Sequence, residues 1–330
     1  MIELKHNELV FRLPEVHKDA ICKIDFQRTL RIPDDNREYS LPPGLGRFQM
    51  EHTDDHSSKL SSMWAERGGV LLPMFQSEAL WINFSGGYPF AVKIATGKVN
   101  AVTGEMWSNA LVKEPQDYLV VPDQPWLDGY CVQKGLIRQF VAMPLGDGYT
   151  AEEQLTGSAE HGGLQIIVYP MKRELYEKMI KRNTDMVFED VCCTMKMMNA
   201  PSEMGLAPGG LMRQEIYEDE YGFDAWDLDA SSRCFVHILN SNQWHNVTGK
   251  PVPSSPPSAV DYTEAGLPWF EYYDDKLNKL KGANKLSGLD SVAAKTVKLG
   301  EQPLKDNEAV TPTKIHSLSH KSTKVAEGNW

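Results

Sequence analysis

The feature that most constrains this chain is a two-residue alternation of apolar and polar side chains in short runs. Ala20, Cys22, Ile24 and Phe26 alternate with a lysine, an aspartate and a glutamine. Period two over this length is typical of a β-strand with one face in a core and the other in water. Further strand candidates cover residues 79–84, 90–95, 98–102, 118–121, 130–133, 136–142, 164–169, 211–217, 233–239 and 267–273.

Strand candidates clearly outnumber helix candidates. Residues 172–182 carry apolar side chains at helical spacing, and a weaker helical pattern covers 186–198. The glycines at 205, 209 and 210 predict a break before the strand at 211–217. Short turn-rich spacers, such as Lys134-Gly135, favour antiparallel pairing. We therefore predict a mainly β fold of the α+β class, an antiparallel β-sandwich or barrel-like body with a few short helices and a disordered C-terminal tail.

Composition changes near residue 276, where lysine, serine and threonine replace aromatic residues. We expect a single β-rich body over residues 1–275, or two packed halves over about 1–170 and 171–275. A flexible lysine-rich tail is predicted over 276–330, with disorder beyond about residue 295, because such a segment buries too little apolar area to offset its ordering entropy. Leu280, Leu286, Leu289 and Val292 leave open the docking of one short piece.

The charge of the chain restricts its partners. The net charge of −11 is the sum of +5 in residues 276–330, which hold 10 lysines and 5 acidic residues, and −16 in residues 1–275. A body this negative repels phosphate backbones, so we expect no nucleic-acid partner. No apolar run reaches the length needed for membrane insertion. The charged N-terminal residues do not resemble a signal peptide, and five cysteines suit reduced thiols, so we expect a cytoplasmic protein.

The common catalytic and cofactor motifs are absent from the sequence. Thr96-Gly97-Lys98-Val99 has the Gly-Lys pair of a phosphate-binding loop but lacks its hydroxyl and first glycine. Cys192-Cys193 are adjacent, so they lack the two-residue separation of a redox pair. The acidic loop 224–229, with Asp224, Asp227 and Asp229, lacks the glycine and glutamate of a calcium loop and is interpreted as a solvated loop. We therefore predict no cofactor and no metal.

Residues 123–163 hold the best candidates for a site. Asp128, Glu153 and His161 could act as acids and bases, and Trp126 and Arg138 could bind a ligand at a loop-rich end of a sheet. Lys93 and Lys98, on neighbouring strand candidates, are further candidates for an anionic ligand. The structural alternative is an Arg138–Asp128 ion pair with Trp126 in the core.

Four segments of the chain are similar to a family of uncharacterised bacterial and fungal soluble proteins. They are residues 28–48 (RTLRIPDDNREYSLPPGLGRF), 124–157, 210–226 and 266–275. The resemblance covers most of residues 20–290. It implies no activity, fold or cofactor, and it assigns a role to no residue.

Two functions fit these observations. The first is a cytoplasmic binding or interaction protein, with a small molecule or another protein as its partner, and with a small-ligand pocket as one form of it. The alternative is a cofactor-independent enzyme that acts on a small polar substrate through carboxylate and histidine acid–base chemistry.

Overall fold

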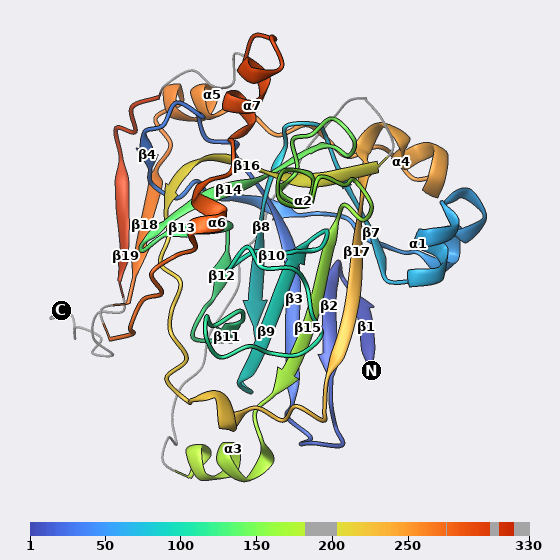
Figure 1. Ribbon diagram of the computed structural model, residues 1–330, viewed down its shortest axis with the longest axis vertical. Helices are drawn as coiled ribbons and strands as arrows, with labels where there is room; N and C mark the ends of the chain where they lie inside the picture. The colour runs from blue at the N-terminus through green and yellow to red at the C-terminus, as the bar shows by residue number, and fades with distance from the viewer. Residues whose placement is uncertain (182–202, 275, 304–309, 320–330) are drawn as a thin grey trace, which may run out of the picture.

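The structure, a computed structural model, describes residues 1–181, 203–274, 276–303 and 310–319 (Figure 1). The predicted mainly β fold is confirmed: within these residues one sheet has 17 strands, and a second sheet has 2. The strands of the first half of the chain are β1 (Ile2–Lys5), β2 (Glu8–Arg12), β3 (Ile21–Thr29), β4 (Glu38–Tyr39), β5 (Gly44–Arg47), β6 (Glu51–His52), β7 (Val70–Met74), β8 (Ala79–Ser85), β9 (Phe90–Thr96), β10 (Val99–Asn100), β11 (Leu119–Val121), β12 (Trp126–Leu127), β13 (Gly129–Gln133) and β14 (Leu136–Pro144). Those of the second half are β15 (Leu164–Pro170), β16 (Glu203–Arg213), β17 (Ser232–Asn240), β18 (Trp269–Tyr273) and β19 (Ile315–Ser319).

The large sheet folds into two halves that share one core. In the first half β1, β2, β3 and β8 pair in that order, and β8 continues to β12 and β14. In the second half β7, β17, β15 and β9 pair in that order, and β9 continues to β10 and β11. The halves are joined where β16 pairs with both β14 and β17. Strands from residues 1–170 and 171–275 therefore pair in the same sheet.

Every second side chain along the strands of both halves points into the core, as the alternation of apolar and polar residues in the sequence predicts. One hydrophobic cluster contains Phe26 of β3, Ile82 of β8, Ile94 of β9, Ile166 of β15 and Val236 of β17, each at most 1% exposed. Burial of these apolar side chains is the main contribution to the stability of the fold.

Short helices surround the sheet. They are η1 (Asp54–Lys59), α1 (Ser62–Arg67), α2 (Ala151–Thr156), α3 (Arg173–Ile180), η2 (Phe223–Ala225), α4 (Ser241–Thr248), α5 (Ala259–Glu264), α6 (Asn284–Ser287) and α7 (Val292–Lys298). α3 confirms the helix predicted over 172–182, whereas the pattern at 186–198 and Cys192-Cys193 lie outside the described residues. Among the described residues, no helix has the length and apolar composition to cross a membrane.

The predicted glycine-rich break before residue 211 is wrong. β16 runs from Glu203 to Arg213 and pairs with β14 along most of its length. Glycine is required here by close packing, because a Cβ atom on Gly210 would lie 2.3 Å from the carbonyl oxygen of Pro33. The glycines of this strand therefore mark close approaches of neighbouring segments, as they often do inside strands.

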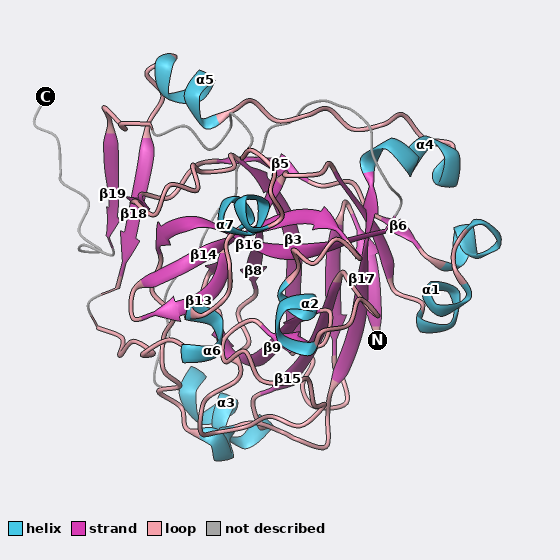
Figure 2. Ribbon diagram, turned by 45° about the horizontal axis from the view of Figure 1, so that its top comes forward, coloured by secondary structure: helices cyan, strands magenta, loops and turns pink. Residues whose placement is uncertain are grey.

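Part of the stretch 276–330, for which a flexible tail is predicted, packs on the body. α6 buries Leu286 completely, and Leu289, Val292 and Val310 are at most 6% exposed. β19 pairs in parallel with β18, on the side of the molecule opposite α1 and α4 (Figure 2). The packed body thus extends beyond residue 275, and described elements continue past residue 295. Residues 304–309 and 320–330 lie outside the described residues.

Candidate functional site

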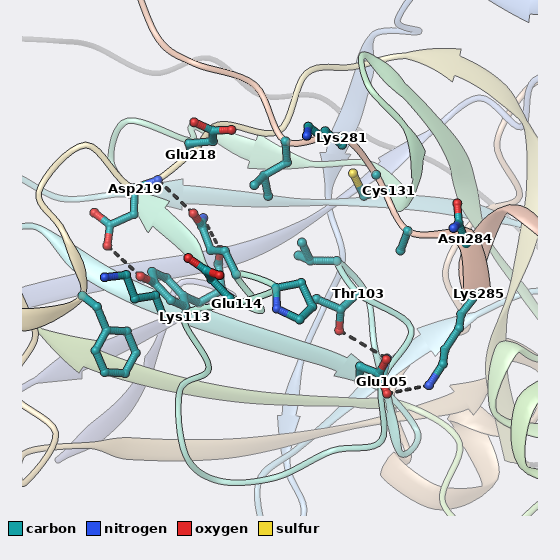
Figure 3. A pocket seen from close by; sticks show the side chains of 18 of the residues that line it. Thr103, Glu105, Lys113, Glu114, Cys131, Glu218, Asp219, Lys281, Asn284 and Lys285 are labelled. Carbon is teal, nitrogen blue, oxygen red and sulfur yellow. Dashed lines mark hydrogen bonds and ion pairs between the residues drawn. The ribbon is translucent and has the colours of Figure 1, made fainter.

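The structure has a cavity with a volume of about 1100 Å³ (Figure 3). Three separate parts of the chain line it: residues 102–118 after β10, residues 218–223 before η2, and residues 280–285 leading into α6. Cys131 of β13 also contributes. A cavity of this size is large enough for a small organic molecule.

Apolar and aromatic side chains form the inner part of the cavity. Val102, Tyr118 and Cys131 are buried, and Phe223 and Leu280 are partly exposed. Burial raises the pKa of the Cys131 thiol to about 12, so Cys131 remains a neutral thiol at neutral pH. The inner part of the cavity therefore offers an apolar contact surface.

A network of hydrogen bonds fixes one wall. Tyr118 donates to Oδ2 of Asp219 at 2.6 Å, and the Trp226 indole donates to the same oxygen at 2.8 Å. The backbone amides of Tyr221 and Gly222 donate to Oδ1 of Asp219 at 2.9 and 3.0 Å. Asp219 is thus saturated with donors, and its role is to hold the 218–223 loop in place.

Charged side chains surround the opening. Lys113, Glu114, Glu218 and Lys281 are exposed and line the cavity, and among the described residues their side chains have no hydrogen bond or ion pair. Glu105 and Lys285, by contrast, pair with each other at 2.5 Å across one side of the opening. The opening therefore presents unpaired groups of both signs to a ligand.

The segment 280–285 closes the cavity from one side as a strap. The amide of Leu280 donates to the carbonyl of Ile216 at 2.7 Å, and that of Ala283 donates to the carbonyl of Cys131 at 2.9 Å. Between them Gly282 has φ +81° and lies so close to Gln133 that a Cβ atom would be 2.5 Å from its Cα. Only glycine suits this crossing.

The residues expected from the sequence lie in other parts of the molecule. Asp128 and Trp126 lie together beside Gln214, whose Nε2 donates to Oδ2 of Asp128 at 2.6 Å. Burial raises the pKa of Asp128 to about 7, and hydrogen bonds from Trp126 and Gln214 oppose the shift. Trp126 packs with Tyr272, with 4.7 Å between ring centroids.

Arg138 does not form the ion pair with Asp128 that the structural alternative anticipates. Its Nη1 donates to the carbonyl of Gly209 at 3.1 Å and lies 3.7 Å from Oδ1 of Asp34. Lys93 is buried in an ion pair with Asp117 and is not accessible to a ligand.

Glu153 has a structural role at the start of α2. Its carboxylate accepts from the amides of Gly146, Gly148 and Thr150 and from the Thr150 hydroxyl, in a capping box. These four donors stabilise the N-terminus of the helix.

His161 and Lys98 lie together, beside Glu160, but away from Asp128. The carbonyl of Asp128 accepts a hydrogen bond from the amide of Phe140 on β14. The loop that holds His161 is bound at another point of the sheet: the amide of Gly163 donates to the carbonyl of Met204, and Met204 pairs with Pro144 of β14. Four residues along β14 separate these two anchor points, which corresponds to about 13 Å. The structure therefore does not bring the three expected acid–base residues together.

No metal centre emerges from the titratable residues. Within the described ranges no group of three or more histidine, cysteine, aspartate or glutamate side chains could hold a metal ion. In the acidic loop 224–229, Asp227 accepts from the amide of Asp229 at 3.2 Å, a local turn bond.

The cavity is not visible in the sequence, because its lining comes from segments far apart in the chain. Residues 280–285 fell within the predicted tail, although Leu280 and Leu286 were the signal that this piece docks. Comparisons with protein-family models, curated protein sequences and solved structures found no match. The resemblance based on four segments therefore stays a prediction.

Proposed function

We propose that this protein binds a small molecule with an apolar part and at least one charged group in the cavity between residues 102–118, 218–223 and 280–285. The observation that carries the proposal is the combination of an apolar interior with unpaired charges at the opening. Pockets that bind small ligands combine an apolar lining with a few placed polar groups in this way.

The charges favour a ligand that carries charge. Lys113 and Lys281 are available to an anionic group, and Glu114 and Glu218 are available to a cationic one. A zwitterion with an apolar body would satisfy both signs at once. We further infer that binding takes place in the cytoplasm, which the free, buried thiols of Cys22, Cys131 and Cys234 favour.

Binding is favoured over catalysis because the carboxylate and the phenol of the cavity wall, Asp219 and Tyr118, are already bonded to each other. Asp219 is engaged by four donors, and Tyr118 donates to it. The alternative of a cofactor-independent enzyme acting through Asp128, Glu153 and His161 has less support, since these residues lie on different elements with different partners. The net charge of −16 in residues 1–275 disfavours nucleic acid as the partner.

The test is a binding screen with a cavity-filling variant. Small apolar amines, acids and zwitterions are titrated into the protein by isothermal titration calorimetry. Asn284 lines the cavity and is exposed, so Asn284→Trp fills space there without disturbing the core. Asn246→Trp on α4 is the matched control, because Asn246 is exposed and outside the cavity.

At least one compound should bind, with an affinity reduced about tenfold or more by Asn284→Trp and unchanged by Asn246→Trp. Lys281→Gln and Glu218→Gln then identify which charged group of the ligand is recognised. Failure of every compound class to bind, or equal binding to the filled variant, would contradict the proposal.

A further inference from the structure

A second cluster of charged side chains lies outside the cavity, around the Glu160 carboxylate. Oε2 of Glu160 is 2.5 Å from Nζ of Lys98 and 3.5 Å from Nε2 of His161. Lys98 lies in the turn between β9 and β10, and His161 lies in the loop before β15, so the pairing of β9 with β15 brings them together. None of these residues lines the cavity.

Arg67 adds a second positive group. It acts on His161 electrostatically, together with Lys98, and its guanidinium lies over the Phe235 ring at 5.5 Å from the centroid. Within the part of the chain that the structure describes, Arg67 donates no hydrogen bond and has no carboxylate within ion-pair distance. In an acidic protein, an arginine without a carboxylate partner is available to an external anion.

The His161 ring is the third polar group of the cluster. Its side chain is only 14% exposed, and neither ring nitrogen has a hydrogen bond within the described residues. Burial, and then the charges of Arg67 and Lys98, lower the pKa of His161 to about 4. A neutral imidazole beside two cations keeps a ring N–H for an anionic acceptor.

Glu152 holds the loop from beneath. Its Oε2 accepts from the amides of His161 and Gly162 at 3.2 and 2.9 Å, and the residue is 1% exposed. Burial raises the pKa of Glu152, and the hydrogen bonds from the amides of Gly162 and His161 oppose this shift. Lys98 and His161 therefore contact one exposed carboxylate, that of Glu160, which is 54% exposed, and Arg67 acts on both Glu160 and His161 electrostatically.

We propose that Arg67, Lys98 and His161 form a binding site for an oxyanion, the carboxylate or phosphate group of a small molecule, and that the Glu160 carboxylate occupies this site in the free protein. The Glu160 side chain is itself a carboxylate, the same kind of group as the proposed ligand. Because this side chain is exposed, it can move out into the solvent when an external oxyanion binds. Arginine supplies paired donors that match carboxylate and phosphate geometry.

The proposal is tested by nuclear magnetic resonance of the histidine ring signals. The His161 signal is assigned with His161→Gln, and inorganic phosphate and benzoate are titrated separately at constant ionic strength and neutral pH. At least one anion should shift the His161 signal with saturation. The anion that binds more tightly identifies the phosphate or the carboxylate as the preferred group.

Two variants separate this site from a general charge effect. Arg67→Gln should weaken anion binding about tenfold or more, and Glu160→Gln should strengthen it several-fold because the internal competitor loses its charge. Arg173→Gln and Glu177→Gln are the matched controls, since this exposed pair on α3 lies elsewhere and should leave the affinity unchanged.

Three results would overturn the proposal. They are a His161 signal that neither anion moves, an affinity unchanged by Arg67→Gln, and a weaker affinity in Glu160→Gln. Each is measured on the full chain, and circular dichroism of every variant verifies that the fold is retained.

Discussion

Lys93 and Asp117 form an ion pair in the interior, with 2.5 Å between Nζ and Oδ2 and a Lys93 side chain that is 1% exposed. Lys93 also donates to the carbonyl of Ala110 at 2.6 Å, and Asp117 accepts from the amide of Val112 at 2.8 Å. The pair thus attaches the loop after β10 to β9. A lysine that the sequence suggests as a ligand-binding group is instead part of the framework behind the cavity.

Replacing Lys93 should therefore destabilise the protein strongly. Lys93→Met leaves Asp117 buried without its partner, and we expect a loss of about 3–5 kcal/mol in the free energy of unfolding. Urea denaturation measures this loss. Lys172→Met, at an exposed position, should change stability by less than about 0.5 kcal/mol. Similar values for the two variants would contradict a structural role for the pair.

Asp128 should make stability depend on pH. Its folded-state pKa of about 7 lies above the unfolded value, so the folded protein retains a proton that the unfolded chain releases. Stability from this group is therefore present at low pH and is lost as pH rises from about 4 to about 7.

Asp128→Asn removes this dependence while keeping an acceptor for Gln214. Relative to the natural chain, the variant should gain stability between pH 5 and pH 8, on the order of 1 kcal/mol or more. The check is urea unfolding of both proteins across this range. A difference that stays constant with pH would show that the pKa of Asp128 is not raised.

Docking of α6 can be tested with two leucines of the C-terminal region. Leu286 is fully buried against β13 and its neighbours, whereas Leu299 is 50% exposed. Leu286→Ala should cost about 2–4 kcal/mol through lost burial and the cavity that it leaves. Leu299→Ala should cost less than about 0.5 kcal/mol. Equal, small effects would mean that this helix does not contribute to the core.

The close approach at Gly210 gives a fourth prediction. In Gly210→Ala the new methyl group would overlap the carbonyl oxygen of Pro33, so backbone shifts should cost about 1–3 kcal/mol. Gly87→Ala, where nothing lies within 4 Å, is the matched control and should be nearly neutral. Thermal unfolding compares the two variants directly. A neutral Gly210→Ala would show that the strand can move apart at no cost.

Local patterns of the sequence were enough to predict much of the strand content. Alternation at Cys22, Ile24 and Phe26 identified β3, because a strand with one buried face must alternate in this way. The helix at 172–182 followed from apolar spacing in the same manner. Gly210 was wrongly interpreted as part of a break in the chain. A glycine that is required because a neighbouring segment lies close to it looks the same in the sequence as a glycine in a turn.

What the sequence determined by itself is the class of the fold, since the side-chain period sets which face of each strand is apolar. What only the tertiary structure decided is which distant residues meet. Lys93 pairs with Asp117, Gln214 contacts Asp128, and the strap at 280–285 closes a cavity with residues 102–118. The physical reason is that strand pairing and loop packing depend on contacts between segments that are far apart in the chain, and local periodicity carries no record of them.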